Sequence, residues 1–145
     1  MNHPAQTLLD LLEANYNLTD EGILKADITW TLQDWSKDDH GKYQPYVSVK
    51  LLGAARDQPV ERNFKFSLVT QVIWWPQNLN ETEAKKALVW KIVEKLRDIA
   101  ETTSLIPTGW QWIIVQRLAD VSVLSGIPNV IIIQMTMLAE IYWSG

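Results

Sequence analysis

The stretch F-K-F-S-L-V-T-Q-V-I-W-W, residues 64–75, decides the fold of this chain. Successive side chains of a β-strand point to opposite faces, so the two sets of alternate residues face different surroundings. In one set, Phe64, Phe66, Leu68, Val72 and Trp74 form one apolar face. The other set begins polar and ends apolar, running Lys65, Ser67, Val69, Gln71, Ile73, Trp75. The stretch predicts a strand with one face in a core and a second apolar patch where the strand ends.

A long helix is predicted to follow this strand. Asn80 is a candidate N-cap, Glu83 stands three residues later as in a capping box, and Leu79 can pack against Ala84. The helix is expected to run to about Thr102, with a core stripe made of Val89, Ile92, Val93, Leu96, Ile99 and Ala100. Trp90 falls about 100° from the centre of that stripe, which places it at the edge or outside.

The remaining elements complete one domain over residues 1–145. A short helix is expected at 4–15, and strands at 23–32, 46–52, 110–123 and 130–143, with a polar exposed loop at 34–45. The last strand is almost continuously apolar, so it should be central in the sheet or covered by a neighbouring subunit. The predicted fold is α+β, with an antiparallel or mixed sheet of about five strands, the long helix on one face and a short N-terminal helix.

Composition narrows the possible functions. The chain has 145 residues, 47% of them hydrophobic and 21% charged, which predicts a folded globular protein. A net charge of −4 without a basic stripe argues against sequence-specific nucleic-acid binding. Zero cysteines exclude disulfides and thiolate sites, and suit a cytoplasmic location. Neither a signal peptide nor a membrane span is expected.

The sequence carries no signature of catalysis. It has no G-x-S-x-G, no glycine-rich phosphate loop and no H-E-x-x-H, and its two histidines are His3 and His40. His40 follows Asp38 and Asp39, but three adjacent residues of a charged turn rarely converge on one ion. We therefore expect no catalytic, cofactor-binding or metal-binding residues, and no enzyme activity.

The eight tryptophans are the strongest departure from average composition. Trp30 and Trp74 are in phase with other apolar residues and are expected in the core, whereas Trp75 and Trp90 are out of phase. Exposed aromatic patches usually mark partner surfaces, so the predicted interface residues are Val69, Ile73, Trp75 and Trp90. An alternative is that Trp35, Trp75 and Trp110 line a groove for a carbohydrate or another flat ligand.

The order and lengths of these elements resemble a known family. A short N-terminal helix, the strand group containing Y-Q-P-Y-V-S-V-K-L-L-G (43–53), the strand 64–75 ending in Trp, a long helix (81–102) and two closing strands look like the tail-terminator and tail-completion proteins of long-tailed phages. The resemblance spans nearly the whole chain. It implies a structural virion protein rather than an enzyme.

The resemblance also implies partners and a location. Family members assemble as rings, commonly hexamers, on the end of the tail tube, stop its growth and form the junction to the head connector. We therefore expect a homo-oligomeric ring in the neck of the virion, assembled in the host cytoplasm, with the tail tube protein and a head-side connector protein as partners. The main alternative function is a tryptophan-rich binding module for a carbohydrate or other flat ligand.

Overall fold

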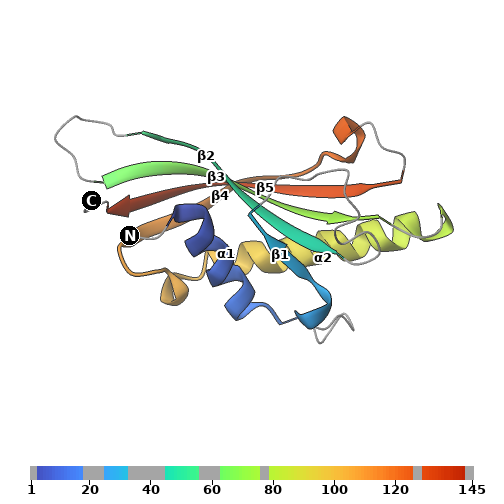
Figure 1. Cartoon of the computed structure of the whole chain (residues 1–145), viewed down its shortest axis with the longest axis horizontal. Coiled ribbons are helices and arrows are strands. Elements are labelled where there is room, and N and C mark those ends of the chain that lie inside the picture. Colours follow the sequence, from blue (N-terminus) through green and yellow to red (C-terminus); the bar gives the residue numbers. More distant parts are fainter. Residues whose placement is uncertain are drawn as a thin grey trace.

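A computed structural model of the chain describes residues 3–17, 25–32, 45–55, 63–75, 79–125 and 129–142. The described part forms one five-stranded sheet with two α-helices on the same side of it (Figure 1). The strand order is β1-β2-β3-β5-β4. The predicted α+β class is confirmed. The sheet is mixed, because β1 pairs with β2 in parallel while the other neighbours are antiparallel.

Two strands at the centre organise the sheet. Strand β3 (Asn63–Trp74) pairs with β5 (Ile131–Tyr142) in an unbroken antiparallel register from Asn63↔Tyr142 to Trp74↔Ile131. Strand β5 is fully buried at Ile131, Ile132 and Ile133 and then alternates. The prediction of a central final strand is confirmed, because two neighbouring strands and the helix layer account for its apolar sequence.

The outer strands frame this pair. Strand β2 (Tyr46–Ala55) runs beside β3 and has a bulge at Leu52. Strand β4 (Trp110–Asp120) forms one edge beside β5, with irregularities between Trp110 and Trp112 and between Val115 and Arg117. Strand β4 ends earlier than the predicted residue 123, because the Asp120 carboxylate accepts hydrogen bonds from the Ser122 backbone and hydroxyl and a 3₁₀ turn, η5 (Ser122–Ser125), follows.

Helices α1 (Pro4–Asn15) and α2 (Thr82–Ala100) cover one face of the sheet. Helix α1 has the predicted bounds and buries Leu8, Leu9 and Leu12. Helix α2 buries most of its predicted stripe, with Val89, Ile92, Val93, Leu96 and Ala100 inaccessible and Ile99 partly buried against the core. A 3₁₀ turn, η4 (Thr103–Leu105), leads from α2 toward β4.

The predicted start of the long helix is wrong. A 3₁₀ turn, η3 (Leu79–Glu81), precedes α2, and Glu81 holds the N-cap position without a side-chain capping bond. Asn80 lies inside this turn, one position before the N-cap residue, so it is not the N-cap of α2. The packing of Leu79 against Ala84 lies outside the described side chains.

The predicted first strand is mostly wrong as well. Strand β1 spans only Thr29–Thr31, and Lys25–Asp27 form a 3₁₀ turn, η2. The Ile28 backbone N–H donates to the Lys25 carbonyl at 3.2 Å, which closes a turn that an extended strand cannot contain. Residues 23, 24 and 34–44, with the predicted loop and His40, lie outside the described residues.

Candidate functional site

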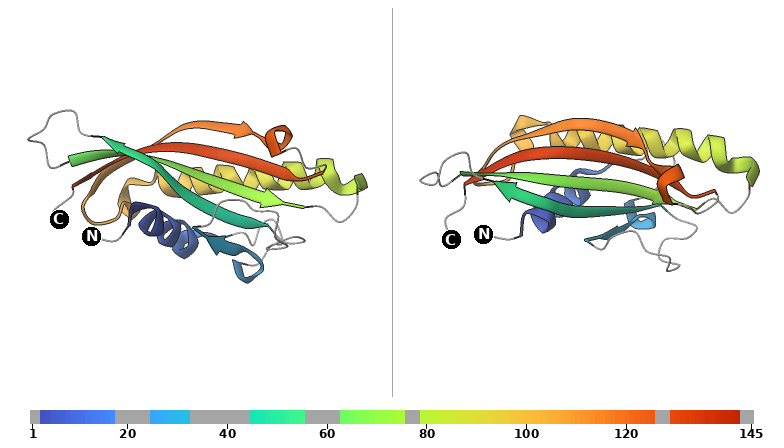
Figure 2. Two further views of the ribbon diagram at one scale, coloured as in Figure 1. Left: turned by 45° about the horizontal axis from the view of Figure 1, so that its top comes forward. Right: turned by 90° about the horizontal axis from the view of Figure 1, so that it is seen from above.

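The sheet has one face without a covering layer among the described elements. Both helices lie on the opposite side, and the view from above looks directly onto the strands (Figure 2). We call this side the bare face. Cross-strand partners share a face, so the register assigns to it the Tyr46–Ile73–Ile132 row at one end and the Lys65–Glu140–Trp112 row toward the other.

At one end of the bare face, apolar side chains pack against one another and bury each other. This end cluster consists of Tyr46, Ile73, Val130 and Ile132, with Trp75 and Val121 packed against them. The rings of Tyr46 and Trp75 stack with their centroids 6.0 Å apart. The cluster is a second, smaller core on the side of the sheet that lacks helices.

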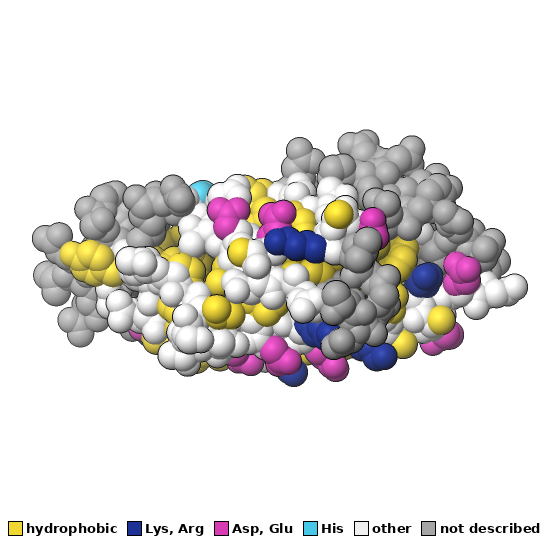
Figure 3. All heavy atoms as spheres, turned by 90° about the horizontal axis from the view of Figure 1, so that it is seen from below, with side chains coloured by type: hydrophobic (Ala, Val, Ile, Leu, Met, Phe, Trp, Pro, Cys, Tyr) yellow, Lys and Arg dark blue, Asp and Glu magenta, His cyan; other side chains and the backbone are white. Residues whose placement is uncertain are grey.

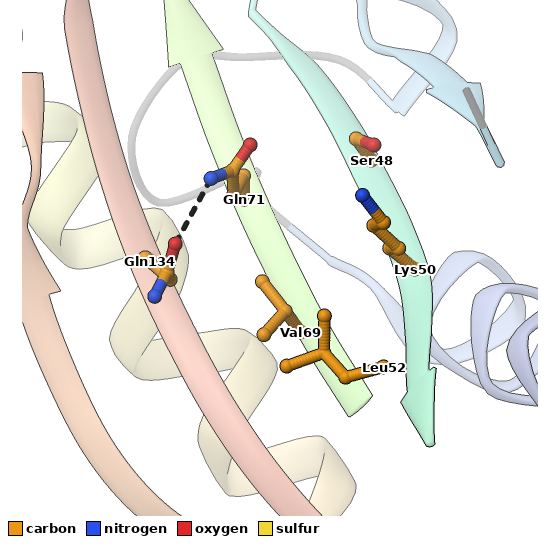
Figure 4. A pocket seen from close by; sticks show the side chains of 6 residues that line it. All are labelled: Ser48, Lys50, Leu52, Val69, Gln71 and Gln134. Carbon is orange, nitrogen blue, oxygen red and sulfur yellow. Dashed lines mark hydrogen bonds between the residues drawn. The ribbon is translucent and has the colours of Figure 1, made fainter. Parts of the chain in front are cut away.

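The middle of the bare face is polar and hollowed. The Gln71 Nε2 donates to Gln134 Oε1 at 2.9 Å, across the two central strands. Beside this amide pair lies a hollow of about 240 Å³, lined by Ser48, Lys50, Leu52, Val69, Gln71 and Gln134 (Figure 4). Strand β2 points its hydroxyl and ammonium groups toward the Gln71 side of the hollow, and Leu52 and Val69 lie together at its other end.

Beyond the hollow an apolar band crosses the sheet. We define the band as Leu52, Val69, Leu138 and Ile114, with Leu138 and Ile114 paired directly across strands. Leu52 is 57% exposed and Ile114 49% exposed, although both are large and apolar. Tyr142, 41% exposed, lies further along the same face.

The far end of the bare face is tied together by Glu140. Its carboxylate accepts a hydrogen bond from Trp112 Nε1 at 2.7 Å and one from Asn63 Nδ2 at 3.4 Å. Trp112 therefore has its ring N–H satisfied and joins edge strand β4 to the centre of the sheet.

The four predicted interface residues do not form one surface. Val69 and Ile73 lie on the bare face but are themselves buried, while Trp75 is half-buried in the end cluster. Trp90 is on α2, partly buried against the main core on the other side of the sheet. The bare face instead exposes Leu52 on β2 and Ile114 on β4, which the sequence prediction did not name.

The predicted separation of Trp74 and Trp75 matches the geometry. Trp74 is 7% exposed and belongs to the main core, where the Lys85 ammonium of α2 lies 4.6 Å from its ring centroid. Trp75 packs on the bare-face side against Tyr46.

The tryptophans predicted to line a ligand groove together do not lie on one surface. Trp110 is buried in the main core beneath the helices, so it faces away from Trp75. Trp35 lies outside the described residues. Trp75 and Trp110 therefore cannot stack on one flat ligand in this structure.

The side of the sheet that carries the helices presents many charged side chains. Acidic and basic side chains of both signs are interspersed there (Figure 3). Partial burial pushes the pKa of Asp120 upward, but its hydrogen bonds with Ser122 and the Lys86 ammonium outweigh this and hold the pKa below its ordinary value. Lys86 Nζ lies 3.3 Å from Asp120 Oδ2, which links α2 to the end of β4.

Within the residues that the structure describes, no three His, Asp or Glu side chains gather in a way that could hold a metal ion. Over the same ranges, no helix combines the length and apolarity needed to cross a bilayer.

Comparisons with known proteins give a distant likeness to a solved structure. No protein-family model matches the sequence, and no curated protein matches it. Among solved structures, the chain is similar to the sheath/tube terminator of PVC, an extracellular contractile injection system, in its extended state. The identity is 14% and the TM-score 0.41, over 94% of this chain and 55% of the other, so this chain spans about half the length of that protein.

Proposed function

We propose that this protein is a structural subunit of a long-tailed virion, a tail terminator that assembles as a ring, commonly a hexamer, and is not an enzyme. In this role it caps the tail tube and joins it to the head-side connector, within the neck of a particle assembled in the host cytoplasm. The observation that carries the proposal is the bare face with its exposed apolar band. The order of helices and strands in the sequence resembles that of tail terminators, and this resemblance supports the role of a tail terminator in particular.

The side chains on the bare face favour contact with protein over contact with water. An antiparallel sheet can face solvent on one side, but its outward positions are then polar. Here Leu52, Ile114 and Tyr142 keep roughly half of their side-chain surface exposed on one side of one sheet. Contiguous exposed apolar surface usually marks a protein interface.

A closed ring requires two different surfaces on each subunit, because each copy contacts one neighbour with one patch and the other neighbour with another. The bare face and the helix side provide two such surfaces on opposite sides of the sheet. They differ in composition, as a head-to-tail contact demands.

Light scattering after size exclusion, combined with negative-stain microscopy, tests the proposal. Over a range of micromolar concentrations we expect one defined oligomer and ring-shaped particles. Ile114→Asp should convert the oligomer to monomer while leaving the melting temperature nearly unchanged, because Ile114 is half exposed on an edge strand.

Val123→Asp is the matched control. Val123 is also an exposed apolar residue, 92% accessible, but it belongs to the turn η5 beyond the end of β4 and not to the apolar band. It should leave the oligomer intact. An unaltered protein that stays monomeric at every concentration and forms no rings would contradict the proposal.

A further inference from the structure

Strand β4 forms an open edge of the sheet. Among the described strands it pairs with β5 on one side and with none on the other (Figure 2). The strand at the opposite end of the order, β1, has only three residues, whereas β4 has eleven. The outer side of an edge strand presents backbone N–H and C=O groups with which a strand of another molecule can pair, and long edges therefore promote aggregation.

The sequence of β4 favours pairing with a copy of itself. Residues 110–116 read W-Q-W-I-I-V-Q, seven consecutive residues without a charge, a proline or a glycine. Five of them are aromatic or β-branched, which are the residue types that favour strands. Exposed segments of this length and composition form stacked β-structure with identical segments. The partner that this edge fits is therefore the same segment of a second copy, since no like charges meet when the two pair.

Irregular pairing protects part of this edge but not all of it. The register of β4 against β5 shifts on either side of residues 112–115. Irregularities of this kind bend an edge strand and hinder the approach of another strand. Within 112–115, however, the pairing is regular, and Ile114 in this piece is exposed although it is large and apolar. The regular piece needs a further form of protection.

The carboxylate of Glu101 covers the end of this regular piece. The Val115 backbone N–H donates to Glu101 Oε2 at 3.3 Å. Backbone N–H groups of a strand lie in the plane of the sheet and point either toward the paired strand or away from it. Glu101 does not belong to β5, so its carboxylate lies at the outer edge of β4, where the carbonyl of an added strand would otherwise accept this bond.

Helix α2 holds Glu101 in this position. Glu101 is the C-cap residue of α2, and its own backbone N–H donates to the Arg97 carbonyl at 2.9 Å. Near the start of the helix, Lys86 Nζ lies 3.3 Å from Asp120 Oδ2 at the end of β4. The helix is thus tied to β4 at two points, and the position of the Glu101 backbone does not depend on its side chain.

We infer that the Glu101 carboxylate guards the edge of β4. It takes the place of a strand carbonyl at Val115 and prevents residues 110–116 from pairing with the same residues of a second copy. Charged side chains placed at an edge are a known means of blocking such pairing. This role goes beyond the proposed ring function and does not depend on it.

Removal of the carboxylate is the first test. Glu101→Ala should raise the exchange rate of the Val115 amide hydrogen about fivefold, the effect of losing one hydrogen bond, as measured by NMR. The same variant should form species larger than those of the unaltered protein, detected by light scattering and by thioflavin T binding. Glu94→Ala is the matched control, because Glu94 is exposed on α2 and makes no hydrogen bond or ion pair with β4 among the described residues. It should leave both measurements unchanged.

A second substitution distinguishes edge pairing from a general loss of solubility. Gln116→Lys adds a charge at an exposed position of the segment, and in the Glu101→Ala background it should abolish the larger species, because a charge within the segment opposes strand pairing. A general loss of solubility predicts the opposite, since each of the two substitutions brings the net charge of −4 closer to zero. Circular dichroism of each variant checks that the fold is intact.

Three results would overturn the inference. If Glu101→Ala and Glu94→Ala behave alike, the carboxylate has no special role at the edge. If the Val115 amide exchanges faster but no larger species form, the irregular pairing alone protects β4. If the larger species persist after Gln116→Lys is added, they form through another surface. Sizes are compared with the oligomer of the unaltered protein, so the test gives the same answer whether or not the proposed ring forms.

Discussion

The two faces of the sheet are built from the same strands but differ in the side chains that those strands contribute. On the covered face, β3 contributes Leu68, Val72 and Trp74 to a core shared with both helices, and all three are buried. On the bare face the same strand contributes a buried end at Ile73, an amide at Gln71 and a half-buried Ser67. The covered face of β3 is apolar except for the buried Thr70, whereas its bare face mixes apolar and polar side chains.

Strand β5 repeats the contrast. Its covered-face residues, from Ile131 to Ile141 at alternate positions, are all fully buried. Its bare-face residues pass from buried Ile132 through half-buried Gln134 to exposed Tyr142. The comparison indicates that the covered face contributes most of the stability, while the bare face leaves large apolar side chains accessible.

Removing the indole of Trp74 should have the largest effect on this contrast. We expect Trp74→Ala to lower the free energy of unfolding by about 3–5 kcal/mol, because it leaves a cavity between β3 and α2 and removes the partner of the Lys85 ammonium. Chemical denaturation measured by tryptophan fluorescence or circular dichroism gives the value. A loss below about 1 kcal/mol would show that the two faces do not differ as described.

The neighbouring substitution gives the sharper comparison. Trp75→Ala should cost only about 1–2 kcal/mol, because Trp75 is half-buried and its main contact is the stacked Tyr46 ring. The fold should survive while assembly of the ring is impaired, which light scattering can measure. If both tryptophan variants unfold alike, the end cluster is as important to the fold as the main core.

The smallest expected effect is at the link between α2 and β4. Asp120→Asn should lower the free energy of unfolding by about 1 kcal/mol through loss of the Lys86 contact and weaker bonds to Ser122. Asp98→Asn is the control, because the Arg97–Asp98 contact is exposed, and it should change stability by less than about 0.5 kcal/mol.

This link has a defined pH dependence. The pKa of Asp120 is lowered in the folded protein, so its contribution is complete above the unfolded pKa of about 4 and is lost as the pH falls through the folded value. The difference between the unaltered protein and Asp120→Asn should therefore disappear in acid. A difference that does not shrink as the pH falls below about 4 would mean that the carboxylate charge is not its source.

Strong periodicity made much of the fold predictable. The alternation in 64–75 gave both the strand and the opposite directions of Trp74 and Trp75, and the leucine spacing gave the bounds of α1. The apolar run from Val130 indicated a central strand, and β5 lies between β3 and β4 with its first three residues buried. In each case a long pattern outweighed local preferences.

Periodicity could not predict the short segments, nor which residues of different strands would lie side by side. Around Ile28 a few alternating residues suggested a strand, but one backbone hydrogen bond to Lys25 was enough to form a turn. The hollow joins β2, β3 and β5, and only register brings Ser48 and Lys50 beside Gln71 and Gln134. The one available signal was Gln134, which interrupts an otherwise apolar strand.

The pairing of β3 with β5 also constrains how the chain acquires its structure. Gln71 and Gln134 meet across 63 positions of sequence, so β3 is synthesised long before its central partner exists. Until β5 arrives, one long edge of β3 and the apolar surface of α2 lack their main covering, and closing so distant a contact is slow. The nascent chain is therefore expected to depend on chaperone protection during synthesis.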